Sequence, residues 1–392
     1  MPNFFLSDAF HHLEVLPVLQ MIIGFVVTAI AAWLLCRLSY VFSIGHDSPF
    51  GVQKFHVNPT SRLGGIAIFL GLALSGLAVP GIVTMAGEQQ VLSAEFHYYS
   101  YWFLLASIPV WFAGLTEDLT HKVGPTWRLV MATISAVLLF STLGISVNRT
   151  DVLPIDLLLS VPGASLCVTL LVVAGFTHSV NIVDGFHGLA CGLIIIALSA
   201  LAFLALKVGD ALLLKMTLTS LAVVLGFFIF NWPKGAIFLG DAGAYLIGFW
   251  VVELGILLVM RNPQISPMAP VVVGLLPLIE TLFSIYRRNV LRNHPVNQPD
   301  SLHLHSLVYR RLFLNSFLSR STDQKNKVNS RVALFFWIPA ALFSSISCTF
   351  NQNTLIQLSL MVVYLGMYIW LYKKLVKFKS PVFMKRIAAI LL

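Results

Sequence analysis

Long apolar windows alternate with short polar joints along almost the whole chain. A helix that crosses a bilayer needs about 20 mostly apolar residues, and such windows recur from Val15 to Tyr372. We therefore predict an all-α polytopic membrane protein with about eleven transmembrane helices, or ten if one short joint is misread. The windows cover residues 15–38, 63–83, 99–116, 129–147, 160–180, 188–206, 212–230, 243–260, 268–286, 332–349 and 354–372.

The composition agrees with this pattern. Of the 392 residues, 58% are hydrophobic and 10% are charged, whereas roughly 25% are charged in an ordinary soluble domain. The first window is too long for the core of a signal peptide, so we expect a retained anchor. We predict one integral-membrane domain over residues 1–392, with a cytoplasmic loop at 287–331 and a basic tail at 373–392.

The basic residues gather on one side of the predicted topology. If successive windows alternate in direction, that side receives 21 of the 25 Lys and Arg residues. The positive-inside rule makes it the cytoplasmic side, with the amino terminus outside and the carboxyl terminus inside. Juxtamembrane Lys and Arg are drawn to anionic headgroups, so the net charge of +9 is explained without nucleic-acid binding.

A first polar segment on this side contains Lys54, His56 and Arg62, followed by Gly64 and Gly65. The three side chains supply cationic donors, and the glycines allow close approach of the backbone. Such a group could bind phosphate. An ordinary positive-inside loop is an equally good interpretation of these residues alone.

Adjacent carboxylates, Glu117 and Asp118, end the third window on the same side. Two neighbouring carboxylates repel each other, which is tolerable where a divalent cation or a shared proton offsets the repulsion. The alternative is a solvated helix end.

Two further joints each hold a carboxylate beside glycines. Asp184 follows Asn181 by one helical turn and precedes glycines that can bring backbone N–H groups to a ligand. Asp241 follows Asn231 and is flanked by small residues that leave room for a metal and its waters. Mg²⁺ takes one or two protein carboxylates and completes its shell with water and phosphate oxygens. We therefore predict Asp241 as the metal ligand, with Asp118 as a second candidate.

The long inner loop contributes His303 and His305. A His-x-His pair can bind zinc, but no pattern for a third ligand accompanies it. Hydrogen-bond donation to a phosphate, or stabilisation of a leaving group, is the role that we expect.

In this order, the five segments resemble the motifs of the polyprenyl-phosphate N-acetylhexosamine-1-phosphate transferase superfamily, which includes WecA-like and MraY-like enzymes. The resemblance covers most of the chain, at residues 56–65, 117–118, 181–189, 231–241 and 303–305. The chain departs from the usual family residues at four positions: Glu117 and Glu280, where aspartate is common, His187, where many relatives carry aspartate, and Ser306, where a third histidine often stands. These departures disfavour the MraY-like subgroup.

The resemblance implies a Mg²⁺-dependent enzyme, with Mn²⁺ as an alternative ion, in the bacterial inner membrane with a cytoplasmic active site. An oxygen of a polyprenyl phosphate such as undecaprenyl phosphate would attack the β-phosphate of a UDP-sugar, and UMP would leave. The implied catalytic residues are Glu117, Asp118, Asp184, Asp241, His303 and His305. The implied substrate-binding residues are Lys54, His56, Arg62, Asn181, His187, Asn231 and Phe238.

Several alternatives stay open from the sequence. Glu117 or Asp118 would deprotonate the lipid phosphate or bind the metal. Initiation of a surface glycan such as O-antigen is the preferred pathway, and transfer of phospho-MurNAc-pentapeptide for peptidoglycan is the alternative. From another class, a secondary transporter would place its site near the midplane, where only Glu253 lies well inside a helix. A homo-oligomer is compatible with the sequence.

Overall fold

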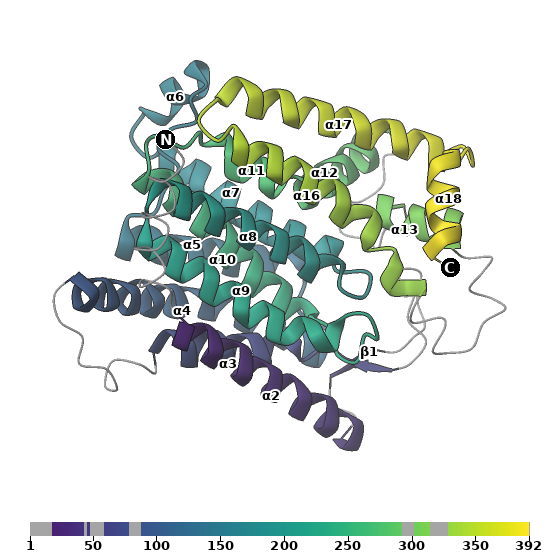
Figure 1. The fold of residues 1–392 in the computed structure, drawn as a ribbon, viewed down its shortest axis with the longest axis horizontal. Helices are drawn as coiled ribbons and strands as arrows, with labels where there is room; N and C mark the ends of the chain where they lie inside the picture. The colour runs from purple at the N-terminus through teal and green to yellow at the C-terminus, as the bar shows by residue number, and fades with distance from the viewer. Residues whose placement is uncertain are drawn as a thin grey trace, which may run out of the picture.

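The computed structural model describes residues 18–42, 45–47, 59–77, 88–291, 302–313 and 328–391. It is 82% helical, and its long helices lie side by side in one bundle (Figure 1). The long helices are α2 (Val18–Phe42), α3 (Gly64–Leu77), α4 (Glu88–Thr120), α5 (Pro125–Leu143), α7 (Ala164–Val183), α8 (Leu189–Val208), α9 (Ala211–Asn231), α10 (Gly240–Arg261), α12 (Leu275–Tyr286), α16 (Leu334–Thr349) and α17 (Thr354–Val376).

Short elements complete the described chain. Strands β1 (His46–Asp47) and β2 (Thr60–Ser61) pair antiparallel, with His46 opposite Ser61. The short helices are α6 (Leu153–Leu159), α11 (Met268–Val273), α13 (Leu304–Val308) and α18 (Val382–Leu391), and two π-helical turns are η1 (Arg287–Leu291) and η2 (Tyr309–Phe313). Figure 1 places β1, α13 and α18 at one end of the bundle and α6 at the other.

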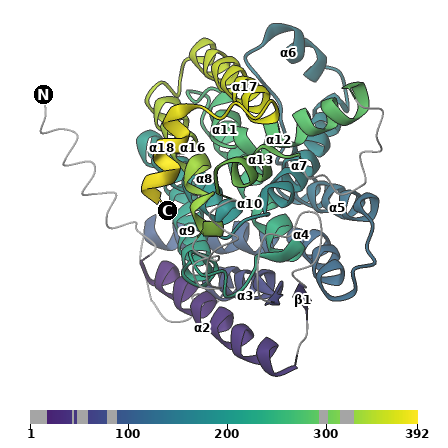
Figure 2. The same ribbon diagram turned by 90° about the vertical axis from the view of Figure 1, so that its right-hand side faces the viewer.

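Helix α10 forms the centre of the bundle. Of its most apolar window, 89% is buried, and it packs against α3, α4, α7 and α8. Figure 2, which faces the end that carries β1, shows α10 surrounded by the other helices. A helix that is hydrophobic all round needs burial on every side, and α10 meets this condition. Its position matters because Asp241 lies in its first turn.

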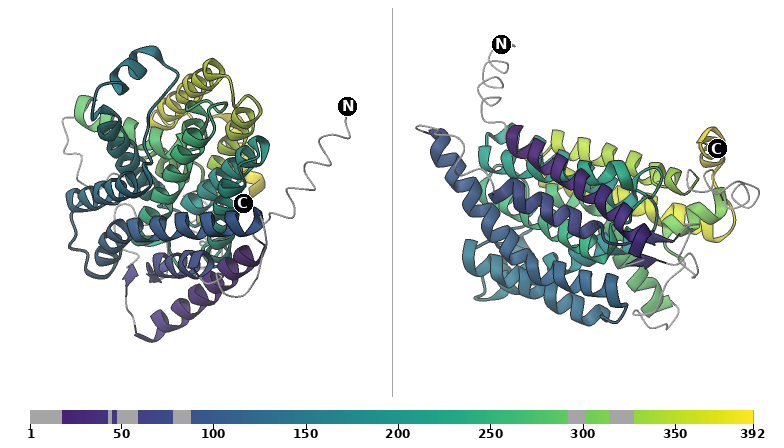
Figure 3. Two further views of the ribbon diagram at one scale, coloured as in Figure 1. Left: turned by 90° about the vertical axis from the view of Figure 1, so that its left-hand side faces the viewer. Right: turned by 90° about the horizontal axis from the view of Figure 1, so that it is seen from below.

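The outermost helices expose their apolar side chains instead. Helix α2 lies on the outside of the bundle against α3 and α9 (Figure 3), and only 17% of its apolar window is buried. Helix α17 has the same buried fraction, with Val362 71% exposed. Eight helices of the described residues are long and apolar enough to cross a membrane. Such surfaces require lipid as solvent, so the prediction of an all-α polytopic membrane protein is confirmed.

Within the described residues, every predicted window overlaps a helix, but the structure divides the windows differently. Window 268–286 is broken at Gly274 into α11 and α12, where a Cβ atom would lie 2.5 Å from the ring of Phe176. Helices α6 and α18 were not predicted. The number of spans, the orientation of the termini and the division of the chain into one domain with a loop and a tail stay predictions.

A polar network, here called the far-end clasp, joins three helices at the end of the bundle that carries α6. It consists of Glu95, Asp210, Arg261 and Asn262. Arg261 contacts Asp210 at 2.8 Å and Glu95 at 3.0 Å, and Asn262 donates to Asp210 at 3.0 Å. Asp210 also caps α9 by accepting from the N–H of Leu213. The clasp fixes the start of α4 and the end of α10 beside each other.

Candidate functional site

The site begins where the carboxyl end of α4 meets the amino end of α10. Asp118 is fully buried, and its two carboxylate oxygens accept from the backbone N–H groups of Asp241 and Ala242, both at 2.9 Å. The first N–H groups of a helix lack partners within the helix, and the helix dipole favours an anion there. Asp118 therefore acts as a cap for α10 and fixes Asp241.

Glycines allow this close approach. A Cβ atom on Gly114 would lie within 2.7 Å of backbone atoms of Asp241 and Ala242. Gly65 of α3 lies against the backbone of Ala242 and Gly243 in the same way. Gly240, just before Asp241, has φ of +71°, a conformation that other residues rarely adopt. The small residues that the sequence places around Asp241 are thus required by packing.

Two arginines hold the carboxylates. Arg62 contacts Asp118 through Nε at 3.1 Å and donates from Nη2 to Asp241 Oδ1 at 2.6 Å. Arg128, in the first turn of α5, donates from Nη1 to Asp241 Oδ2 and stacks 5.8 Å from the ring centroid of Tyr245. We call Arg62, Asp118, Arg128 and Asp241 the acid–arginine centre. It joins segments from four parts of the chain.

Backbone hydrogen bonds position Arg62. The N–H of Phe238 donates to Ser61 at 2.8 Å, and the N–H of Gly64 donates to Phe238 at 3.1 Å. These bonds run on both sides of Arg62 and tie it to the joint that precedes α10. Phe238 therefore lies beside the acid–arginine centre, and its role in substrate binding stays a prediction.

Asp184 lies directly after α7 and shares the electrostatic field of this centre. Burial raises the pKa of its carboxyl to about 7, Arg62 opposes this shift, and Asp241 adds to it. Within the described part of the chain, no hydrogen bond or ion pair engages its oxygens, in contrast to those of Asp118 and Asp241. Asp184 is therefore the carboxylate best able to take a new partner.

Glu280 of α12 gathers the histidine segment. Its oxygens face Nδ1 of His303 at 3.4 Å and Nδ1 of His305 at 3.2 Å, and they accept from the backbone N–H of Leu304 and His305 and from the hydroxyl of Tyr368. The two imidazoles stack with centroids 5.2 Å apart. A carboxylate at Nδ1 fixes the orientation of an imidazole ring. The histidines are thus positioned before any ligand arrives.

The histidine segment meets the joint that carries Asp184. A Cβ atom on Gly185 would lie 3.3 Å from Nε2 of His305, and the Phe186 and His305 ring centroids are 5.7 Å apart. The ring of His187 lies 5.6 Å from that of Phe238. The joints after α7 and before α10 and α13 therefore lie next to one another.

Asn231 and Glu117 have structural contacts in this arrangement. Asn231 is buried; it accepts from the N–H of Gly188 and donates to the carbonyl of Ile237, both at 2.9 Å, which ties two joints together. Glu117 accepts from the N–H of Val123 at 2.7 Å and orders the joint before α5. Asn181 lies one helical turn before Asp184, whose N–H donates to its carbonyl at 3.2 Å. Lys54 and His56 lie outside the described residues.

The sequence analysis missed Arg128 and Tyr368 and treated Glu280 only as a departure from a family pattern. Arg128 follows Glu117 by eleven positions, and only the joint that returns α5 toward α10 makes it a partner of Asp241. Tyr368 and Glu280 lie inside apolar windows, where a polar side chain is costly without a partner. That cost is the signal that could have identified Glu280.

The carboxylates of the site are suitable Mg²⁺ ligands, but most of their oxygens already contact arginines or backbone N–H groups. No group of three His, Cys, Asp or Glu side chains within the described residues is arranged to hold a metal ion. Both oxygens of Asp241 face arginines, and both oxygens of Asp118 accept N–H groups. Since Mg²⁺ needs only one or two protein carboxylates, Asp184 fits it as placed, and Asp241 fits it once an arginine moves to another anion.

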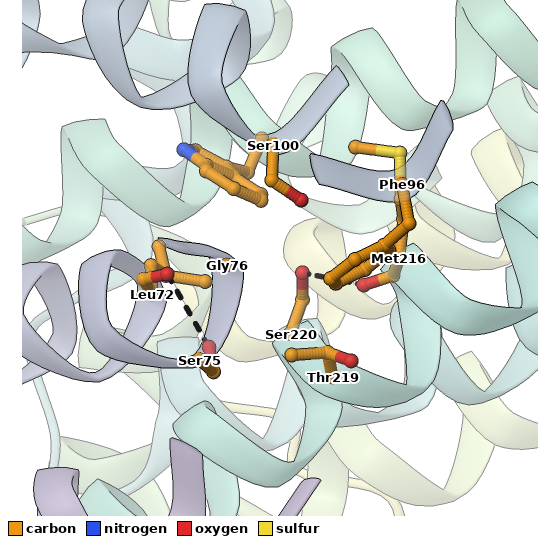
Figure 4. Close-up of a pocket in the computed structure, with 9 residues that line it drawn as sticks. Leu72, Ser75, Gly76, Phe96, Ser100, Met216, Thr219 and Ser220 are labelled. Carbon is orange, nitrogen blue, oxygen red and sulfur yellow. Dashed lines mark hydrogen bonds between the residues drawn. The ribbon is translucent and has the colours of Figure 1, made fainter. Parts of the chain in front are cut away.

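One small cavity lies elsewhere, between α3, α4, α9 and α10. Figure 4 shows the hydroxyls of Ser75 and Ser220 directed to the backbone carbonyls of Leu72 and Met216 beside it. The hydroxyl of Thr219 and the indole N–H of Trp250, which also line the cavity, have no partner in the described part of the chain. None of its lining residues belongs to the acid–arginine centre.

The fold and site define a polytopic helical membrane protein with a buried acid–arginine centre at one end of its bundle. A model of glycosyl transferase family 4 matches residues 100–259. That range contains Asp118, Asp184 and Asp241, whereas Arg62 and His305 lie outside it.

Three curated relatives extend the match. A probable undecaprenyl-phosphate N-acetylglucosaminyl 1-phosphate transferase of Bacillus subtilis is 26% identical over 73% of this chain and 76% of its own length. A decaprenyl-phosphate N-acetylglucosaminephosphotransferase of Mycobacterium tuberculosis is 28% identical over 64% of this chain and 66% of its own. A phospho-N-acetylmuramoyl-pentapeptide-transferase of Shouchella clausii is 25% identical over 79% of this chain and 88% of its own length. The resemblance to the polyprenyl-phosphate N-acetylhexosamine-1-phosphate transferase superfamily is confirmed.

Proposed function

We propose that the protein transfers an N-acetylhexosamine 1-phosphate from a UDP-sugar to a polyprenyl phosphate, releasing UMP. The observation that carries the proposal is the convergence of Asp118, Asp184 and Asp241 with Arg62 and Arg128 at one end of a membrane bundle. Catalysis of phosphoryl transfer rests on positioning and on stabilising charge. Fixed carboxylates and guanidinium groups supply both.

The reaction exchanges one phosphorus–oxygen bond for another. An oxygen of the lipid phosphate bonds to the β-phosphorus, and the bond from that phosphorus to the oxygen bridging to the α-phosphate breaks. The bridging oxygen leaves as part of UMP, and the sugar stays on its phosphate. No proton has to leave carbon, and a lipid phosphate anion is already a nucleophile.

Each residue of the centre has a role in this reaction. Arg62 and Arg128 would donate to phosphate oxygens of the two substrates, since a guanidinium matches the geometry of phosphate. Asp118 keeps Asp241 at the start of α10. His305, oriented by Glu280, would meet the diphosphate beside Asp184. Mg²⁺, held by Asp184 and Asp241, would offset the charge of the diphosphate when bound.

Location at one end of the bundle favours a transferase over a transporter, whose site would lie near the midplane. We infer that this end faces the cytoplasm, because 21 of the 25 Lys and Arg residues lie on its side of the predicted topology. In a bacterial inner membrane, the product would initiate a lipid-linked surface glycan. The relative from Shouchella clausii keeps a phospho-MurNAc-pentapeptide donor as the second candidate.

The decisive test compares Asp241→Asn with the parent chain in nanodiscs that contain polyprenyl phosphate and Mg²⁺. UDP-GlcNAc and UDP-MurNAc-pentapeptide are offered separately, and released UMP and lipid-linked product are measured. We expect a loss of at least 100-fold in Asp241→Asn, the scale for removing a group that stabilises transition-state charge. The matched control is Asp151→Asn, an exposed aspartate at the opposite end of the bundle. Retained activity in Asp241→Asn would remove this residue from the reaction.

A further inference from the structure

Helix α18, near the end of the chain, has one apolar face that packs on η2 and a second apolar face that is exposed in the described part of the chain. Met384 and Ala388 are buried where α18 packs on η2. Phe383, Ile387 and Ile390 are 55%, 38% and 84% exposed. Their spacing of four and three residues places them in one stripe along the helix. An exposed apolar stripe on a helix outside the spans needs a partner.

The position of α18 limits what that partner can be. The apolar span α17 ends at Val376, and residues 377–381 lead to α18. Fully extended, these five residues reach roughly 16 Å, so the start of α18 lies close to the end of the span. Arg311 of η2 donates to the carbonyl of Leu375 at 3.2 Å, and its guanidinium lies 3.6 Å from the ring centroid of Phe378. This joint is fixed where the apolar span ends. Figure 1 shows α18 running across the direction of α17.

Charge adds a second requirement. The sequence has no Asp or Glu after Asp323. The last turn of α17, the joint and α18 together carry six exposed basic residues, Lys373, Lys374, Lys377, Lys379, Lys385 and Arg386. On the helix, Arg386 borders the exposed apolar stripe, and Lys385 lies on the opposite side. A basic helix with an exposed apolar stripe fits an anionic bilayer surface.

We infer that α18 is an interfacial helix that inserts Phe383, Ile387 and Ile390 into the bilayer surface. Arg386 of α18 and the basic residues of the joint, Lys377 and Lys379, bind the phosphate headgroups of anionic phospholipids in the same leaflet. Because α18 packs on η2, which continues from α13, the lipid surface also supports the segment that carries His305. The inference concerns lipid binding and stands apart from the proposed transfer reaction.

The test places a fluorophore on the full chain after Cys36→Ser and Cys167→Ser; the two other cysteines are buried. The probe is attached at Ile390→Cys, or at Ala389→Cys as the control, about 100° away around the helix. Nanodiscs contain phosphatidylcholine alone or mixed with phosphatidylglycerol, and brominated acyl chains quench the probe. We expect several-fold stronger quenching at position 390 than at 389, and an increase with phosphatidylglycerol that added salt weakens.

A charge variant tests the headgroup contacts. Lys379→Gln with Arg386→Gln should weaken the response to phosphatidylglycerol several-fold. The matched control, Lys122→Gln with Lys234→Gln, removes two exposed basic residues from other joints and should leave the response intact. Equal quenching at 389 and 390, or no effect of phosphatidylglycerol and salt in the parent chain, would overturn the inference. Energy transfer between labelled copies in place of lipid quenching would assign the stripe to a dimer and overturn it as well.

Discussion

At the scale of single residues, the three aspartates differ in what surrounds them. Asp118 uses both oxygens on the N–H groups of α10, and Asp241 uses both on arginines. Asp184 is half-buried near them without such a partner in the described residues, and the pKa of its carboxyl is raised to about 7. The same side chain thus serves as a cap, as an anchor for cations and as a titratable group.

This difference predicts a pH dependence of stability. The pKa of Asp184 is about 7 in the folded chain and near 3.8 when unfolded, so the folded state binds the proton more tightly. Its contribution to stability is complete below about pH 4 and is lost as the pH rises through 7. Asp184→Asn cannot lose a proton. We therefore expect the difference in melting temperature between Asp184→Asn and the parent to rise by several degrees from pH 4 to pH 7. Above pH 7 this difference should stay constant.

Thermal unfolding in detergent across this pH range measures the effect. Asp151→Asn, which changes an exposed aspartate paired with Arg149, should differ from the parent by a constant amount across this range. Parallel curves for Asp184→Asn and the parent would show that Asp184 titrates normally.

Some residues of the candidate site could be identified from the sequence because a charged side chain beside an apolar run is unusual. Asp118, Asp184, Asp241 and Arg62 are ionisable groups beside apolar runs, and their cost in a membrane marks them. Arg128 follows a helix start with nothing unusual around it. Its role depends on which helix lies opposite, and a linear pattern does not contain that information.

At the scale of elements, the contact between α4, α3 and α10 determines the geometry of the site. Gly114 and Gly65 let two helices reach the first turn of α10. The sequence identified the glycines beside the charged motifs, but only the structure shows that Gly114 packs against the backbone of α10. The break between α11 and α12 was not predictable either, because it lies inside one continuous apolar window. Helix α18 was missed because its ten residues in the basic tail are too few for a window of spanning length.

Gly114→Ala should therefore separate α4 from α10. The added methyl group would meet backbone, which cannot move aside as a flexible side chain does, and overpacking of this kind costs about 1–3 kcal/mol. We expect a lower melting temperature. We also expect at least a tenfold loss of UMP release, because Asp118 would no longer reach the N–H groups at the start of α10.

Gly175 of α7 provides the matched substitution. Nothing lies within 4 Å of a Cβ atom there, so Gly175→Ala should be neutral, or stabilising by about 0.5–1 kcal/mol through helix propensity. If both alanine variants behave alike in melting and in UMP release, the close approach at Gly114 has no influence on the site.

At the scale of the whole molecule, two networks of ion pairs lie at opposite ends of an apolar bundle. One end carries the acid–arginine centre and the histidine segment, and the other carries the far-end clasp. This separation was predictable, because helices that alternate in direction bring every second joint to the same side. The partners within each end had to come from the structure.

Removal of divalent cations tests the proposed role of Mg²⁺ on the complete protein. We expect EDTA to abolish release of UMP and to leave the melting temperature nearly unchanged, because arginines already hold Asp241. Added Mg²⁺ should restore transfer, and Mn²⁺ should do so in part. Full turnover in EDTA would leave catalysis to the arginines and histidines alone.

Helix α10 is anchored at both ends, by Arg62 and Arg128 at Asp241 and by Glu95 and Asp210 at Arg261. Its 22 residues span about 33 Å, so the reaction centre has a fixed height above the opposite leaflet. A bilayer of unsuitable thickness must then strain one anchor or the other. Turnover in lipids of graded acyl-chain length should pass through a maximum, and a flat profile would show that membrane thickness does not reach the site.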